Sequence, residues 1–253
     1  MSLLGWLFGK KEDIVIDHVD NDRKVNFKED KLKKFNNILE FAKSVFIEYE
    51  NSLGYVSKEP ICAKEHPIID VIRVLGRTLQ TEALSALLFD KSDRSDLSIR
   101  SFDVIFHTFG IIENEDLKVE VNIEKEVQLS KDVILPWPWN RDRLINNISR
   151  IGEGRVFGKW KQDSNHRGIL WLPIGITWVE QGNHSIATGI IQGDGVIKPR
   201  NVYDISPVYN HVFCDGEYYR KKADNSIITK VKSVEFAAIF EIGRMMVEKG
   251  ITF

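Results

Sequence analysis

One stretch of the sequence, residues 171–191 (WLPIGITWVEQGNHSIATGII), limits the fold most strongly. Its segment Ile174 to Val179 is apolar and rich in β-branched and aromatic residues, which predicts a strand buried on both faces. The polar run Glu180 to Asn183 breaks this strand, and the segment after Ser185 predicts a helix. A strand that passes through a short polar turn into a helix indicates a mixed α and β fold, and such turns often carry functional groups.

The turn itself supplies the first candidate site residues. Gly182 tolerates a positive φ and lets a ligand approach the backbone, and Asn183 is among the few other residues that accept this geometry. Ser185 is the expected N-cap of the helix, whose free N–H groups and partial positive charge would attract a phosphate. His184 lies at the mouth of this site as a proton donor, acceptor or metal ligand, unless it only bonds a neighbouring carbonyl in a structural turn.

A second segment, Pro136-Trp137-Pro138-Trp139-Asn140-Arg141, leads into a helix expected over Asp142 to Ile151. This segment resembles the P-x-x-N-R entry of the ParB N-terminal and sulfiredoxin-like fold, and Gly182-Asn183-His184-Ser185 resembles its G-x-H-R box. The resemblance covers Val133 to Tyr209 and implies that the turn grips a nucleotide phosphate, with the second helix carried onto the phosphates. The two motifs together are also similar to an uncharacterised bacterial family of unknown function, which implies no activity.

Two positions depart from the pattern of that fold. Ser185 stands where the fold has an arginine, so the bidentate phosphate contact would come from Arg141, Arg143 or Arg167. Asn183 stands where sulfiredoxins have their catalytic cysteine, which excludes their sulfinic-acid chemistry.

The predicted function is therefore the binding, with hydrolysis or transfer left open, of a nucleotide or nucleic-acid phosphate. His184 would be the catalytic acid/base or a phosphate donor, and Arg141 would neutralise charge. Glu180 would help to hold a magnesium ion. The predicted ligand-binding residues are Gly182, Asn183, Ser185, Asn140, Arg141, Glu180 and Arg167. The alternative is a non-enzymatic interaction or regulatory protein that retains the fold, with a protein partner or a homo-oligomer left open.

A metal site is a further hypothesis, because three histidines, His166, His184 and His211, each follow an asparagine. Three imidazoles can hold a catalytic metal if the fold brings them together, although their spacing matches no known ligand signature. The identity of any metal stays open.

Charge and cysteine content limit the classes of ligand and the cellular compartment that we expect. The formal net charge of −2 argues against a generally basic nucleic-acid coat, although residues 131–200 carry ten Lys or Arg against six Asp or Glu. With only Cys62 and Cys214, no disulfide framework is expected, and we predict a cytoplasmic protein. No stretch approaches the roughly 20 apolar residues that span a bilayer, and residues 1–11 predict a short arm.

Hydrophobic periodicity predicts an α+β fold in three parts. These are an arm or linker over 1–30, a helical pair and a hairpin over 31–128, and the ParB/sulfiredoxin-like region with a C-terminal helix over 129–253. The expected elements are helices over 32–49, 67–89 and 234–248 and hairpin strands over 104–108 and 117–123.

Overall fold

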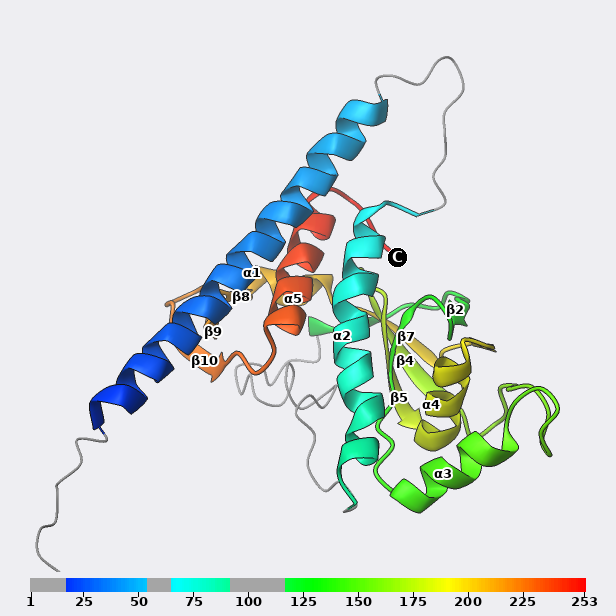
Figure 1. The fold of residues 1–253 in the computed structure, drawn as a ribbon. Coiled ribbons are helices and arrows are strands. Elements are labelled where there is room, and N and C mark those ends of the chain that lie inside the picture. The colour runs from blue at the N-terminus through cyan, green and yellow to red at the C-terminus, as the bar shows by residue number, and fades with distance from the viewer. Residues whose placement is uncertain (1–16, 54–64, 92–116) are drawn as a thin grey trace, which may run out of the picture.

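The computed structural model describes residues 17–53, 65–91 and 117–253, and it confirms the α+β class (Figure 1). The helices are α1 (Asp17–Leu53), α2 (Ile68–Phe89), α3 (Arg141–Arg150), α4 (Asn183–Gln192), α5 (Val234–Glu248) and the 3-10 helix η3 (Ser206–Asn210). None of the helices in these ranges has the length and apolar character needed to cross a membrane.

A five-stranded mixed sheet in the order β1-β7-β4-β5-β3 forms the centre of the molecule. Its strands are β1 (Val119–Glu120), β3 (Val133–Leu135), β4 (Arg167–Leu172), β5 (Ile176–Gln181) and β7 (Asn201–Asp204). The central pair β4 and β5 is antiparallel, with Ile169 opposite Trp178, while β3 runs parallel to β5 and β7 parallel to β4. Smaller sheets are formed by β2 (Val127–Gln128) with β6 (Val196–Ile197), and by β8 (Val212–Cys214), β9 (Tyr218–Lys221) and β10 (Ile227–Lys230).

Side chains of the sheet alternate between two hydrophobic cores. On β4, Ile169 and Trp171 belong to the larger core, whereas Leu170 and Leu172 belong to a second core that includes Ile186 of α4. Successive residues of a strand point to opposite faces, so this alternation places helices on both sides of the sheet. The sheet therefore lies between α2 and α5 on one face and α4 on the other (Figure 1).

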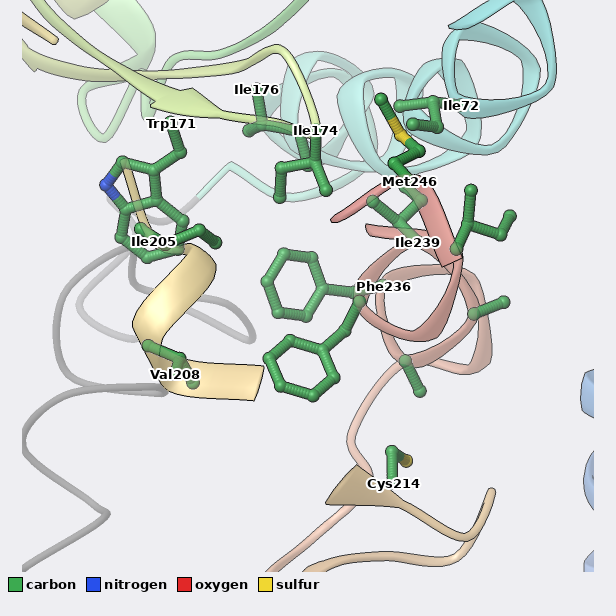
Figure 2. Close-up of a cluster of buried hydrophobic side chains, with 14 of the residues drawn as sticks. Ile72, Trp171, Ile174, Ile176, Ile205, Val208, Cys214, Phe236, Ile239 and Met246 are labelled. Atoms are coloured by element: carbon green, nitrogen blue, oxygen red, sulfur yellow. The ribbon is translucent and has the colours of Figure 1, made fainter. Parts of the chain in front are cut away.

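Figure 2 shows the larger core, in which Trp171 and Ile176 of the sheet gather with Ile72 of α2 and with Phe236 and Ile239 of α5. The predicted C-terminal helix is confirmed with its predicted bounds, and it packs between the helical pair and the sheet. Burial of these large apolar side chains on both sides of α5 provides the main driving force for its docking.

Gly243, which weakens the helical propensity of α5, has a packing role. A Cβ atom built at this position would lie 2.1 Å from the hydroxyl oxygen of Tyr209 and 2.5 Å from Cγ2 of Ile174. Only glycine therefore allows α5 to approach these two side chains this closely. Arg244 fixes the same region, because its guanidinium donates to the carbonyl oxygens of Tyr209 and Val212 and to the Glu241 carboxylate.

Two predicted elements differ in the structure. Helix α1 begins at Asp17, inside the segment expected to be a linker, since a charged composition suits a helix end as well as a linker. The expected strand over 117–123 is limited to β1, which pairs with β7 at the sheet edge. Its expected hairpin partner over 104–108 lies outside the described residues.

The single described cysteine, Cys214, is buried at the end of β8 (Figure 2). Burial raises the pKa of its thiol to about 12, so the thiolate is scarcely populated near neutral pH. Cys214 thus has the character of a small core residue. Cys62 lies outside the described residues.

Arg73 of α2 connects this helix to the loop before β3. Its guanidinium donates to Asp132, whose side chain is 5% exposed, and to Glu65 and Asp70. Asp132 also accepts a hydrogen bond from the backbone N–H of Gln128, at 2.8 Å. The cluster is the charged link between α2 and the sheet.

This link predicts acid sensitivity. The hydrogen bond from Arg73 lowers the pKa of Glu65 from 4.5 to about 2, so its contribution to stability is full above pH 4.5 and is lost as the pH falls towards 2. Because the Glu65 side chain is 37% exposed, we expect a loss of only about 1 kcal/mol. Urea denaturation at pH 6 and pH 3 measures it. The Glu65→Gln variant should lose less stability over this range than the wild type, whereas Glu48→Gln on exposed α1 should match the wild type.

Candidate functional site

The strand-to-helix turn consists of Gly182 alone. β5 continues through Glu180 and Gln181, because its pairing with β4 extends to the Arg167–Gln181 pair, and α4 begins at Asn183. Gly182 has φ 81° and ψ 18°, the left-handed conformation that glycine adopts without strain. The expectation that the polar run from Glu180 breaks the strand was therefore wrong.

Gly182 is also the N-cap of α4, and it provides no side-chain cap. The prediction that Ser185 caps the helix was wrong, because the serine is the third residue of α4, where its hydroxyl oxygen accepts a hydrogen bond from Trp160 Nε1 at 3.1 Å. A Cβ at Gly182 would lie 2.5 Å from His166 Cδ2 and 2.9 Å from the Asn165 carbonyl oxygen. The turn therefore needs glycine for its conformation and for its close contact with the chain before β4.

The two motifs that lie more than forty residues apart meet at this turn. The backbone N–H of Trp137 donates to Asn183 Oδ1 at 2.5 Å, and the N–H of Asn140 donates to His184 Nε2 at 3.0 Å. Asn140 in turn caps α3, since its side-chain oxygen accepts from the N–H of Arg143 at 2.8 Å. The N-terminal ends of α3 and α4 are thus joined by side chains that the sequence singled out.

His184 is a buried member of this junction. Its ring forms a T-shaped pair with the Trp139 ring, with the ring centroids 5.4 Å apart, and the residue is 8% exposed. Because Nε2 accepts from Asn140, the neutral imidazole carries its proton on Nδ1. The structure therefore gives His184 a defined role in holding α3 against α4, and its acid/base role stays a prediction.

A cavity of about 670 Å³ opens beside the first turn of α4. It is lined by Gly182, Asn183, His184 and Ser185 from the turn, by the cations Arg143, Lys159 and Lys161, by the carboxylates Asp163 and Glu180, and by several aromatic rings. Free N–H groups in the first turn of a helix attract negative charge, and the three cations exceed the two carboxylates. The charged side chains of the lining thus have a small excess of positive charge, to which the start of α4 adds.

Two of the predicted arginines point elsewhere. The Arg141 guanidinium donates to the carbonyl oxygens of Leu87 and Asp90, at 2.9 and 3.1 Å, and so binds the C-terminal end of α2. Arg167 is the first residue of β4 and does not line the cavity. Arg143 alone among the three arginine candidates reaches it, and its guanidinium lies 4.9 Å from the centre of the Trp139 ring.

Several cavity residues were missed in the sequence because they lie in the irregular segment 151–166. This segment contributes Phe157, Lys159, Trp160 and Lys161, in addition to Asp163. The mixture of glycines, basic residues and aromatic rings in GEGRVFGKWK could have indicated a binding segment. Because this segment has no periodicity, however, its sequence does not show which side chains point towards the cavity.

His166 forms the wall beneath the turn. Its ring packs on Trp160, with the centroids 4.9 Å apart, and its Nδ1 accepts a hydrogen bond from the N–H of Asp163 at 2.9 Å. Burial lowers the pKa of His166, which keeps the imidazole neutral near pH 7. His166 therefore supports the turn through packing and a neutral hydrogen bond.

The metal hypothesis gains no geometric support. Within the described ranges, no group of three or more His, Cys, Asp or Glu side chains is placed to hold a metal ion. His211 follows η3 and does not line the cavity that His166 and His184 share. Glu180 lines the cavity together with Asp163.

Fold and site together define an α+β protein with a cation-bearing cavity between α3 and the first turn of α4. Residues 20–253 match a family described as "Family of unknown function (DUF6710)", and the chain belongs to this family. The predicted membership of a family of unknown function is thereby confirmed. No curated protein and no solved structure matches the chain.

Proposed function

We propose that the cavity at the start of α4 binds the phosphate of a nucleotide or nucleic acid, in the manner that the resemblance to the ParB/sulfiredoxin-like fold implies. The observation that carries this proposal is the shared lining of the cavity by the uncapped first turn of α4 and by Arg143, Lys159 and Lys161. Helix N-termini and cationic side chains both favour phosphate, and here they face one space. The succession of strand, glycine turn and helix in this region also supports the resemblance to the ParB/sulfiredoxin-like fold.

Arg143 is the residue that we assign to the phosphate contact, in the role that the arginine of the box has in the resembling fold. Asn140 fixes the backbone of Arg143, and Trp139 lies beneath its guanidinium. An arginine side chain held by a ring loses less conformational freedom when it binds an anion, and its planar donors match phosphate oxygens.

Hydrolysis or transfer would need more than this binding site. An acid/base role for His184 at Nε2 would break the hydrogen bond that joins Asn140 to α4. Magnesium is usually held by one or two carboxylates together with phosphate oxygens, which is the arrangement that Glu180 and Asp163 would provide around a bound phosphate. Binding is therefore the function that we propose. Hydrolysis or transfer of a bound ribonucleotide can be followed in the calorimetric titration with magnesium that tests this binding.

A second candidate function is a non-enzymatic interaction or regulatory role. An apolar groove of about 850 Å³ lies between α1 and α2, and it is lined by Phe41 and Val74, which are 61% and 66% exposed. Large exposed apolar residues on neighbouring helices are typical of surfaces that bind proteins. This surface is separate from the α4 cavity, so the two functions do not exclude each other.

Calorimetric titration with inorganic phosphate and with ribonucleotides, with and without magnesium, tests the proposal. We expect the Arg143→Gln variant to bind about tenfold more weakly, because it loses one charge-assisted contact worth about 1.4 kcal/mol. The matched control is Arg77→Gln, which removes an exposed arginine of α2 outside the cavity and should leave the affinity unchanged. Equal affinities for the wild type and Arg143→Gln would contradict the assignment of Arg143. Absence of binding to all these ligands would contradict the function.

A further inference from the structure

The wall of the cavity contains aromatic rings that remain accessible to solvent. Trp139 is 39% exposed and Phe157 is 60% exposed, and the two rings come from different segments of the chain. Each ring has a guanidinium nearby, from Arg143 at 4.9 Å and from Arg150 at 6.0 Å. Rings exposed beside cations form the platforms on which nucleic-acid bases stack while the backbone phosphates meet positive charge.

The same surface continues beyond the cavity. Val156, beside Phe157, is 81% exposed, and neither Val156 nor Arg150 lines the cavity itself. The segment 150–161 carries four Lys or Arg against one glutamate. A mononucleotide has one base and would use only part of this surface, whereas a strand of several nucleotides would extend along it.

From these contacts we infer that the natural ligand of the site is a single-stranded nucleic acid, whose bases stack on Trp139 and Phe157 and one of whose phosphates enters the cavity. This inference rests on the proposed phosphate-binding function. A duplex is disfavoured, because its bases are already stacked on one another and cannot reach two separate rings.

The test is fluorescence anisotropy of a labelled twelve-nucleotide strand of mixed sequence, as DNA and as RNA, with the full chain. We expect the Phe157→Ala variant to bind about tenfold more weakly and the Trp139→Ala/Phe157→Ala double variant more weakly still. The matched control is Phe89→Ala, which removes an exposed ring of α2 that lines neither the cavity nor the groove and should change the affinity less than twofold. The affinity of the wild type should fall as salt is raised, because phosphate contacts release counterions.

Additional ligands in the same experiment distinguish a failure of this inference from a failure of the proposed function. If the wild type binds ribonucleotides but not the strands, or if Phe157→Ala binds the strands as the wild type does, the inference is wrong and the phosphate site stands. If neither phosphate, ribonucleotides nor strands bind, both proposals fail. A blunt duplex of the same sequence that competes as well as the single strand overturns the inference. Binding to anionic phospholipid vesicles without binding to strands overturns it in favour of a membrane surface.

Discussion

The Arg73→Met variant is expected to lose about 3–5 kcal/mol of the free energy of unfolding, because it leaves a buried carboxylate without its cation. The Arg73 guanidinium donates to one carboxylate oxygen of Asp132 through Nε at 3.1 Å and through Nη2 at 2.7 Å. Both side chains are nearly inaccessible, at 7% and 5% exposure. Methionine fills a similar volume, so the loss would come from the uncompensated charge more than from an empty space.

Urea denaturation of three further variants locates the cause of this loss. The Arg73→Met/Asp132→Asn double variant should recover part of the stability, because it removes the isolated charge together with its partner. Asp70→Asn should cost less than 1 kcal/mol, because the Asp70 side chain is 73% exposed. Arg77→Met removes an exposed arginine from the same helix and should lie within about 0.5 kcal/mol of the wild type. A loss below 1 kcal/mol in Arg73→Met would show that the link between α2 and the Asp132 loop is not needed for stability.

The Gly182→Ala variant is expected to lose about 2–4 kcal/mol of stability and, with it, phosphate binding at the start of α4. An alanine at φ 81° is strained, and its Cβ would meet His166 Cδ2 at 2.5 Å and the Asn165 carbonyl oxygen at 2.9 Å. Backbone cannot move aside as easily as a flexible side chain. The turn would therefore shift relative to the chain before β4.

Gly193 at the other end of α4 is the matched control. It has φ 66°, but a Cβ there would meet nothing nearer than Ser130 Cβ, at 3.9 Å. Gly193→Ala should therefore show only the conformational cost of about 1 kcal/mol. Thermal unfolding of both variants measures the loss of stability, and phosphate titration of each variant measures the loss of binding. Equal losses in the two variants would show that the contact with His166 and Asn165 does not contribute.

Sequence patterns predicted the regular parts of this fold because their periodicity reports which face is buried. The apolar positions of α5 gave both ends of the helix, and the expected start of α3 at Asp142 lies one residue after its start at Arg141. The start of α4 was placed too late, because the pairing of β4 with β5 keeps Gln181 in the strand. The end of a strand depends on how far its partner strand continues, so the pattern of the strand alone does not show where it stops.

The candidate site could be predicted only in part, because the contacts of its side chains also depend on residues that are far away in the sequence. Gly182 and His184 were identified because they lie where the expected strand passes into a helix, and both line the cavity. Arg141 was assigned to the phosphate, but the end of α2, more than fifty residues earlier, holds its guanidinium. Lys159 and Lys161 were missed because they reach the cavity from an irregular segment. The direction of a side chain depends on its neighbours in the tertiary structure, and a local sequence pattern does not show these neighbours.

The order of elements in the larger core has a consequence for synthesis on the ribosome. α1 and α2 are synthesised before α5, yet α5 is the helix that packs against their apolar sides, and it begins more than 140 residues after α2 ends. The edge strand β1 similarly waits for β7, more than eighty residues later. Nascent chains fold from the N-terminus onward, and uncovered apolar surface favours aggregation. The apolar sides of α1 and α2 therefore remain incompletely buried until α5 has been synthesised, and during this interval they are open to non-native association.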